Sequence, residues 1–405
     1  MKSGNTCADT EDNIGENAGR NTGGNNGGNV RKTAVVITIL AGAFAVMAMS
    51  NAVVPVLNLL AGDSPQTQGI IYSAYFLGAF LTVLPAGMIS DRVGRTLPIR
   101  AGLILTVVAG TAMILLSNPY MIAAARFAEG IGAGLFVASA LAWINEQEEH
   151  KKISGYYFAC INLGFLTSLL LTGLLSGYSL MTGVLIFTVL ATLALLLSFG
   201  TIRKEFGGTA KPESAAESTL KQKSGLFSII KECRNIFIAT AVLTGTTGVV
   251  ISVYPGFSGI SALGAGILAG LMNLGTIAAS LYASRISGRN IRYEIPAGAF
   301  VIAALVLMIL LIPADSLIAA GLLFVAIGGV YGAVNIVLVD SLSKTRFGQG
   351  AVLGAFNLFG YAGMSFMPFA AGVIAENSYP WAFAVTAILC LALCAVVFFT
   401  AKETE

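Results

Sequence analysis

Twelve long apolar segments, spread over almost the whole chain, limit what this sequence can fold into. A helix needs roughly 20 apolar residues to cross about 30 Å of hydrocarbon, because each backbone polar group must be satisfied inside its own helix. The chain has 405 residues, of which 56% are hydrophobic and only 11% are charged, too few charges for a water-soluble domain. We therefore predict an all-α integral membrane protein. The expected spans are 33–60, 67–89, 97–117, 119–144, 154–177, 180–200, 236–254, 258–283, 295–313, 316–341, 349–374 and 379–401.

The basic residues are divided unevenly between the loops that join these spans. Of the 23 Lys and Arg side chains, all but Arg126 fall in the loops and tails of one face. The charged residues in the loops of the other face are all acidic, namely Asp63, Asp315 and Glu376. Positive charge collects on the cytoplasmic side of membrane proteins, so we expect both termini to be cytoplasmic and the chain to be multi-pass in the cell membrane. A missed or invented span would scatter the basic residues over both faces.

A polar connection follows the sixth span and divides the chain into two similar parts. We expect a disordered cytoplasmic tail at 1–32, a six-helix half at 33–200, a cytoplasmic loop at 201–235, a second six-helix half at 236–401 and a short tail at 402–405. Within the loop, the segment 227–237 is either a surface amphipathic helix or a plain linker. Gly155, Asn162, Leu163 and Gly177 recur at one constant spacing as Gly350, Asn357, Leu358 and Gly372. Common origin of two halves explains this, and chance matching in Gly- and Leu-rich helices is the alternative.

The loop between the second and third spans carries the most specific motif. Residues 87–96 read GMISDRVGRT, which resembles the GxxxDRxGRR signature of the major facilitator superfamily. The resemblance implies that family's fold, with 12 transmembrane helices in two six-helix pseudo-repeats. Thr96 departs from the pattern, where the family often has a second basic residue.

The motif residues suggest a conformational gate made of Gly87, Asp91, Arg92, Gly94 and Arg95. If the halves pack as in the family, the exposed N–H groups at 348–350 face the carboxylate of Asp91 and latch the cytoplasmic side shut. Arg92 and Arg95 would then tie the loop to nearby acids or to lipid phosphates. The alternative is an anchor that serves topology only.

A second motif lies inside the fourth span. Arg126 to Gly134 reads RFAEGIGAG, which is similar to the RxxxGxG motif of many proton-coupled members of that superfamily. A charge at this depth requires a partner or water, and Glu129, three residues on, lies on nearly the same helix face. We interpret Arg126 and Glu129 as a proton-coupling or substrate-facing pair, with a static ion pair as the alternative. Gly130, Gly132 and Gly134 would let a neighbouring helix approach closely.

A third signature of the superfamily, the GPxxGG motif of its antiporters, is half present in the fifth span. Gly164, Gly173 and Gly177 keep the glycine spacing and are expected to pack helices, but Leu174 and Tyr178 replace the proline and the final glycine. This departure weakens any specific assignment to drug/proton antiport.

Polar and aromatic residues near the middle of the spans are the candidates for contact with a cargo. On the spans that line the cavity in this family, they are Asn51, Tyr75, Asn162, Asn273, Tyr331, Asn335, Asn357 and Tyr361. Each is also a plausible hydrogen-bonding residue between helices. The scarcity of charge within the spans favours a neutral or lipophilic cargo.

Taken together, these features predict a secondary active transporter of a small organic molecule that works by alternating access as a proton-coupled exporter. Uptake or facilitated diffusion of a small nutrient is the alternative, and a transporter-like sensor or a membrane-embedded enzyme is a more distant one. The chain has no GxxxxGK[ST] phosphate loop and no cluster of nucleophiles or metal ligands in its spans. We therefore expect no enzymatic activity, cofactor, metal or nucleic-acid partner, and we expect protons, lipid and a small-molecule substrate to be the partners of a monomer.

Overall fold

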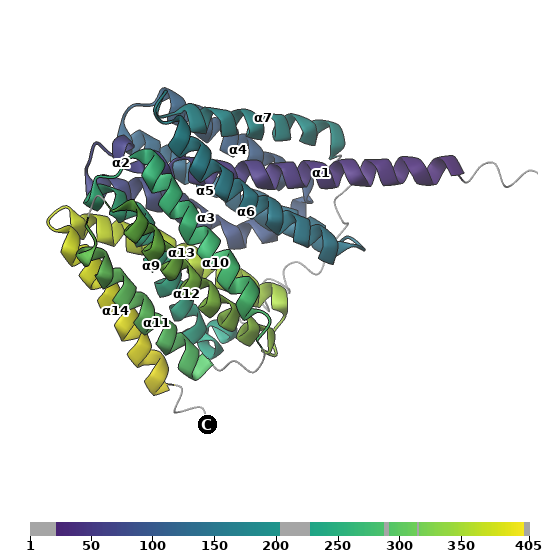
Figure 1. Cartoon of the computed structure of the whole chain (residues 1–405). Helices are drawn as coiled ribbons and strands as arrows, with labels where there is room; N and C mark the ends of the chain where they lie inside the picture. Colours follow the sequence, from purple (N-terminus) through teal and green to yellow (C-terminus); the bar gives the residue numbers. More distant parts are fainter. Residues whose placement is uncertain (1–21, 203–226, 287–290, 314–315, 401–405) are drawn as a thin grey trace, which may run out of the picture.

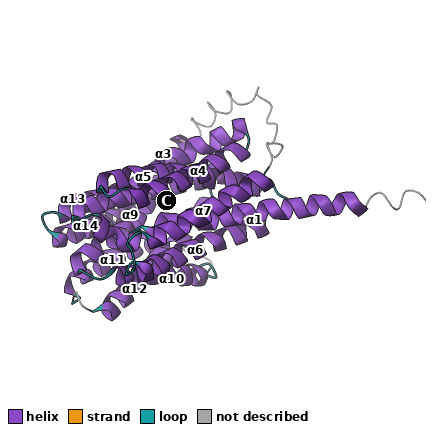
Figure 2. Cartoon of the chain, turned by 90° about the horizontal axis from the view of Figure 1, so that it is seen from above, coloured by secondary structure: helices purple, strands orange, loops and turns teal. Residues whose placement is uncertain are grey.

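The computed structural model describes residues 22–202, 227–286, 291–313 and 316–400, and within these ranges it contains helices and turns but no strand (Figures 1 and 2). Twelve of its helical segments are long and apolar enough to cross a membrane. The elements are α1 (Thr22–Ala52), η1 (Val54–Val56), α2 (Leu57–Leu60), α3 (Pro65–Val93), α4 (Thr96–Leu115), α5 (Pro119–Asn145), α6 (His150–Leu175), α7 (Thr182–Thr201), α9 (Arg234–Ser258), α10 (Ala262–Ala283), α11 (Ile291–Met308), η4 (Ile309–Leu311), α12 (Leu317–Ser343), α13 (Gln349–Ala375) and α14 (Tyr379–Thr400).

Local sequence explains where several of these helices begin and end. Ser64 and Asn118 accept hydrogen bonds from free N–H groups at the starts of α3 and α5, and a proline follows each of them. Gly94 ends α3 with a φ of 84°, and Gly259 ends α9 with a φ of 65°. These are backbone conformations that favour glycine, so both helices stop where the sequence allows a left-handed residue.

Several predicted boundaries differ from the structure by a few residues, and three differences change the description of a span. Helix α1 begins at Thr22, inside the segment expected to be a disordered tail, because a helix already nucleated by a span extends at little further cost. The first span is also interrupted near Pro55, where η1 and α2 replace a single helix. Helix α9 continues through Pro255 to Ser258 instead of ending at Tyr254. The predicted tails at 1–21 and 402–405 and most of the central loop, 203–226, lie outside the described residues.

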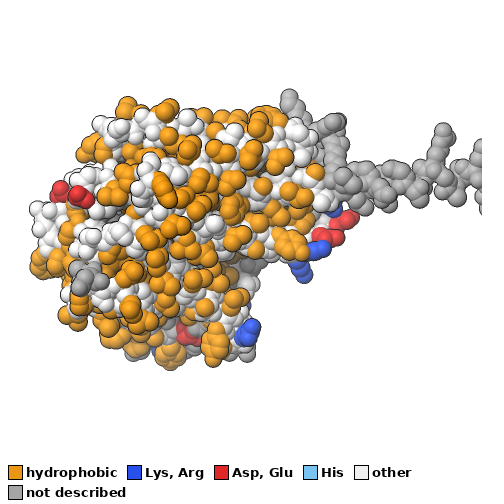
Figure 3. Space-filling view, turned by 45° about the horizontal axis from the view of Figure 1, so that its top comes forward, with side chains coloured by type: hydrophobic (Ala, Val, Ile, Leu, Met, Phe, Trp, Pro, Cys, Tyr) orange, Lys and Arg blue, Asp and Glu red, His pale blue; other side chains and the backbone are white. Residues whose placement is uncertain are grey.

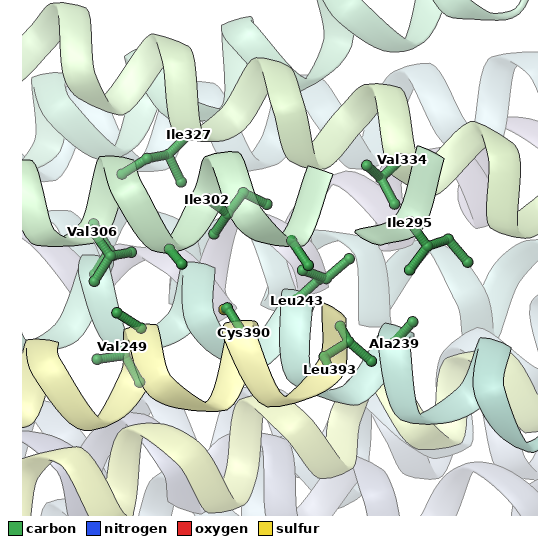
Figure 4. Packing of buried hydrophobic residues seen from close by; sticks show 14 of the residues in the cluster. Ala239, Leu243, Val249, Ile295, Ile302, Val306, Ile327, Val334, Cys390 and Leu393 are labelled. Atoms are coloured by element: carbon green, nitrogen blue, oxygen red, sulfur yellow. The ribbon is translucent and has the colours of Figure 1, made fainter. Parts of the chain in front are cut away.

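The helices form two groups, α1 to α7 and α9 to α14 (Figure 1), each with its own buried core, and Figure 4 shows the core of α9 to α14. Between the groups, α3 packs along α13 and α6 packs on α10. In Figure 3 hydrophobic side chains cover the middle of the visible face, and its few charged side chains lie toward the ends. We call the end with Asp63 and Glu376 the acidic end, and the end with Arg92, Lys152 and Lys344 the basic end.

The two groups touch most closely at the acidic end. A Cβ atom at Gly69 of α3 would lie 2.6 Å from the carbonyl oxygen of Pro368 in α13, and one at Gly372 would lie 2.6 Å from that of Pro65. The pair α6 and α10 meets in the same way, since a Cβ atom at Gly173 would lie 3.0 Å from the Ala262 carbonyl oxygen. Toward the basic end the helix groups diverge (Figure 1), and a Cβ atom at Gly348 or Gly350 would meet open space. The structure is therefore closed at the acidic end.

Candidate functional site

A cavity of about 220 Å³ lies between the two helix groups. Its walls combine aromatic rings, methionines and small polar side chains, with no Lys, Arg, Asp or Glu. The lining residues are Met47, Ser50, Asn51, Tyr72, Tyr75, Phe76, Phe165, Thr247, Ile251, Met272, Asn273, Thr276, Tyr331, Tyr361 and Met364. An apolar pocket with a few convergent polar groups is the usual form of a small-molecule site.

Five of the eight predicted cargo residues line this cavity: Asn51, Tyr75, Asn273, Tyr331 and Tyr361. Asn335 is not a lining residue but contacts one, since its Nδ2 donates to the Tyr331 hydroxyl at 3.0 Å. Asn162 and Asn357 are not among the lining residues. The amide of Asn162 instead donates to the Phe158 carbonyl oxygen of its own helix at 2.8 Å.

The lining residues that the sequence did not single out are mostly apolar. Met47 lies one turn before Asn51, and Tyr72 lies one turn before Tyr75, so helical spacing from a predicted residue points to both. The same spacing places Phe165 one turn after Asn162 and Met364 one turn after Tyr361. No comparable signal identifies Ile251, because nothing in an apolar membrane sequence separates a cavity wall from a lipid-facing surface.

A buried ion pair lies directly behind one wall of the cavity. Arg126 Nη1 of α5 donates to Glu129 Oε2 at 2.7 Å, and the two side chains are 1% and 0% exposed. The guanidinium carbon of Arg126 lies 4.6 Å from the centre of the Tyr75 ring, and Tyr75 lines the cavity. The pair is therefore separated from the cavity by a single aromatic side chain of α3.

The pair keeps unused hydrogen-bonding capacity. Within the described part of the chain, Glu129 Oε1 and Arg126 Nε have no hydrogen-bond partner, and both atoms are buried. Burying a charge is costly unless it is paired and fully hydrogen-bonded. A carboxylate held by one hydrogen bond in such a place is a group that can take up a proton when its pairing changes.

Glycines bring the helices together around this pair. A Cβ atom at Gly130 would overlap the carbonyl oxygen of Tyr75, and one at Gly132 would lie 2.8 Å from that of Gly102 in α4. Gly134 faces the Thr82 side chain, and Gly164 faces the Phe44 carbonyl oxygen of α1. These are van der Waals contacts that a larger residue would break. A Cβ atom at Gly177 or Gly87 would meet open space, so the packing expected of Gly177 is absent from this structure.

The motif loop at the basic end is held by Arg95. Its Nη1 donates to Asp91 Oδ1 at 2.5 Å and to Ser90 Oγ at 3.1 Å, and its Nη2 donates to Glu146 Oε1, at the end of α5, at 2.7 Å. Partial burial lowers the pKa of Arg95, but these bonds to Glu146 and Asp91 raise it more, so its pKa lies above the ordinary value. In this state the carboxylate of Asp91 binds Arg95 within its own helix group, and the contact with the start of α13 is not made.

Comparison with known proteins agrees with this architecture. The family model described as the Major Facilitator Superfamily matches residues 39–368, which is more than half of the chain. The chain belongs to the major facilitator superfamily. It is therefore a membrane transporter rather than an enzyme.

Similar solved structures share the superfamily's fold. A peptide transporter in complex with sulfate aligns with a TM-score of 0.72 at 12% identity, covering 91% of this chain and 94% of the other. A D-xylose-proton symporter aligns with a TM-score of 0.70 at 13% identity, covering 90% and 97%. A bacterial homologue of the human lysosomal transporter Spinster, in an inward-facing and occupied conformation, aligns with a TM-score of 0.67 at 16% identity, covering 92% and 97%. Identities this low show the fold alone.

One curated relative is similar in sequence over a shorter stretch. The multi-drug resistance efflux pump PmrA homolog of Lactococcus lactis subsp. lactis is 32% identical over 113 residues, which is 27% of this chain. The match spans 28% of that relative's length.

Proposed function

We propose that this transporter exports a small organic molecule across the cell membrane by alternating access, driven by protons. The cavity between the helix groups is the cargo site, and the Arg126–Glu129 pair behind Tyr75 is the proton-coupling site. The observation that carries this proposal is the short path from a buried carboxylate, through one aromatic ring, to the cavity wall.

The geometry suggests how proton binding and cargo binding influence each other. A proton on Glu129 removes the charge that balances Arg126, and the guanidinium then depends more strongly on the face of the Tyr75 ring. Because Tyr75 also forms part of the cavity wall, the change in charge reaches the cargo without direct contact. The bonds of Asp91 and Arg95 at the basic end belong to a state that is open on that side, which we assign to the cytoplasm.

Uptake or facilitated diffusion is the competing function. The half-present third motif favours it, and one of the aligned structures is a D-xylose-proton symporter. Export is preferred because the relative at 32% identity is an efflux pump.

The test is flux into or out of proteoliposomes that hold the purified full chain, with an imposed pH gradient and a panel of small organic compounds. We expect the gradient to drive accumulation of a compound by the wild-type protein. Glu129→Gln should remove this dependence on the gradient, because the amide cannot exchange a proton. Glu148→Gln is the matched control, since Glu148 is exposed at the basic end and pairs with Lys32 only at 3.9 Å. Fully pH-coupled flux in Glu129→Gln would refute the coupling role.

A further inference from the structure

The amide and aliphatic hydroxyl groups of the cavity wall present mainly hydrogen-bond acceptors. Asn51 on α1 and Asn273 on α10 line the cavity from the two helix groups. Asn51 Nδ2 donates to the Met47 carbonyl oxygen at 3.4 Å, and Asn273 Nδ2 donates to the Ala269 carbonyl oxygen at 2.9 Å. A carbonyl oxygen cannot donate, so the nitrogen of each amide must face its own helix. Each Oδ1 is therefore left as a hydrogen-bond acceptor.

The hydroxyl groups of the wall follow the same pattern. Ser50 donates to the Met47 carbonyl oxygen at 2.8 Å, Thr247 to that of Thr244 at 2.7 Å, and Thr276 to that of Met272 at 3.0 Å. Because a hydroxyl has a single hydrogen, Thr247 and Thr276 offer only lone pairs to a ligand, and Ser50 Oγ already accepts a hydrogen bond from Asn51 Nδ2 at 3.0 Å. The tyrosine hydroxyls of the wall are the exception. That of Tyr72 donates to Met364 Sδ at 3.5 Å, whereas those of Tyr331 and Tyr361 can donate or accept.

We infer that the cavity selects small aromatic compounds that carry N–H or O–H hydrogen-bond donors, and that it rejects anions. This inference rests on the proposed function, because it names the cargo class of that cavity. A donor on the cargo satisfies the carbonyl oxygens of Asn51 and Asn273, whereas a carboxylate would meet lone pairs. The rings of Tyr72, Phe76 and Tyr361 are tilted against one another, with centroids 5.1 Å and 6.4 Å apart in that order, and give the wall an aromatic surface for an aromatic body. A volume of about 220 Å³ is below the roughly 300–1,000 Å³ of drug-sized sites, so the cargo has one or two rings.

The test is equilibrium binding to the full chain in nanodiscs, with binding to empty nanodiscs subtracted and with no pH gradient. Indole and 1-methylindole form a pair in which a methyl group replaces the hydrogen of the N–H donor, and phenol and anisole form a second pair, in which it replaces the hydrogen of the O–H donor. We expect the donor-bearing member of each pair to bind roughly tenfold more tightly, and indole-3-acetate to bind less tightly than indole. Equal affinities within both pairs, or no binding by either donor-bearing compound, would overturn the inference.

Asparagine variants connect this selectivity to the two residues. Asn51→Leu and Asn273→Leu should each bring the two indoles to within about threefold of one another while 1-methylindole still binds. Asn162→Leu is the matched control, because its amide donates to a carbonyl oxygen in the same way but does not line the cavity. Loss of selectivity in Asn162→Leu as well would contradict the assignment. Selective binding without proton-driven flux would leave this inference standing and would refute only proton coupling.

A different observation concerns the acidic end. Glu376 closes α13, and its Oε2 accepts hydrogen bonds from Ser64 Oγ and from the backbone N–H of Gln66, both at 3.1 Å. Ser64 is the N-cap residue of α3 and Gln66 lies in its first turn, in the other helix group. The first N–H groups of a helix have no partner within it, and the N-terminus attracts negative charge. Glu376 therefore caps α3 across the boundary between the groups.

The position of Glu376 is unfavourable within its own helix, because a carboxylate at a helix C-terminus opposes the helix dipole. At the opposite end of α3, Asp91 occupies the equivalent place in the last turn, and α13 begins at Gln349 with no side-chain cap. Each of the two helices thus carries an acidic residue near its C-terminal end, and that end faces the start of the other helix. In this structure only the contact at the acidic end is made.

We propose that Glu376 is a positioning residue for transport that holds the acidic end closed. Opening of that end breaks its bonds to Ser64 and Gln66. This proposal does not depend on the cargo or on the coupling ion.

Distances between spin labels at Tyr178 and Ile318 report on this contact. Both residues are exposed at the acidic end, one in each helix group. The native cysteines of the full chain are replaced first, and thermal unfolding of the cysteine-free protein is checked against that of the wild type. The labels are then attached at the two positions. Glu376→Ala should raise the ratio of the separated to the close population about fivefold. Ser64→Asp should raise it as well, because aspartate still caps α3 but repels Glu376.

Asn377→Ala, next to Glu376 in the same exposed loop, is the control and should keep the wild-type distances. Adding Glu376→Ala to Ser64→Asp should reduce the ratio to that of Glu376→Ala alone. Wild-type distances in either Glu376→Ala or Ser64→Asp would overturn the proposal.

Discussion

The guanidinium of Arg126 contacts a carboxylate on its own helix and an aromatic ring on the next one. The first contact could be predicted from the sequence, because residues three apart share a helix face and a charge at this depth requires a partner. The second could not, since it depends on how α3 crosses α5. Cavity residues divide in the same way, with Asn51 and Tyr361 recognisable as polar groups in apolar spans and Ile251 indistinguishable from lipid-facing residues.

A buried pair of this kind predicts an unusual order of stabilities. Arg126→Leu leaves the Glu129 carboxylate buried without its partner and should lower the free energy of unfolding by about 3–5 kcal/mol. The double variant Arg126→Leu/Glu129→Leu removes both charges and should unfold within about 1 kcal/mol of the wild type. Thermal unfolding of the detergent-purified variants ranks the three proteins. A double variant less stable than Arg126→Leu would show that the ion pair makes a net favourable contribution to the free energy of unfolding.

At the scale of the helices, the sequence predicts the twelve spans and their alternation but not their ends. Helix α9 passes through Pro255 because the break in its hydrogen bonds lies inside a packed bundle, and it stops at Gly259, where φ becomes positive. The start of α1 at Thr22 lies in a Gly- and Asn-rich stretch whose composition favours no helix. Boundaries of this kind depend on packing and on extension from a span, which residue types alone do not record.

Glycine contacts between helices predict graded effects of adding one methyl group. At Gly130 a Cβ atom would overlap the Tyr75 backbone, which cannot move without shifting α3, so Gly130→Ala should destabilise the protein by about 1–3 kcal/mol. At Gly155 of α6 nothing lies within 4 Å, so Gly155→Ala should be neutral or stabilise by up to about 1 kcal/mol. Thermal unfolding of both variants in one detergent measures the difference. Equal destabilisation by the two would mean that the contact between α3 and α5 is looser than described.

Across the whole molecule, the helix groups meet at the acidic end and diverge at the basic end (Figure 1). Spans joined by short loops must alternate in direction, so the placement of every charged loop follows from the number of spans. The arrangement of the two helix groups, by contrast, depends on contacts such as Gly69 with Pro368, between residues far apart in the chain. A list of spans cannot specify which end is closed.

The threading of the spans predicts which residues water-soluble reagents reach from each side. Single cysteines introduced by Asp63→Cys and Asn377→Cys should react with a membrane-impermeant thiol reagent added to intact cells, because the charge distribution of the loops predicts that the acidic end faces outward. Those introduced by Lys152→Cys and Lys344→Cys should react only after the membrane is permeabilised, because loops rich in Lys and Arg stay in the cytoplasm. All four residues are exposed, so the membrane alone decides the difference in labelling. Three spans, α3, α4 and α5, lie between positions 63 and 152 and place them on opposite sides. Labelling of both positions from the same side would require an even number of spans between them. That result would reject the topology and with it the assignment of the open end to the cytoplasm.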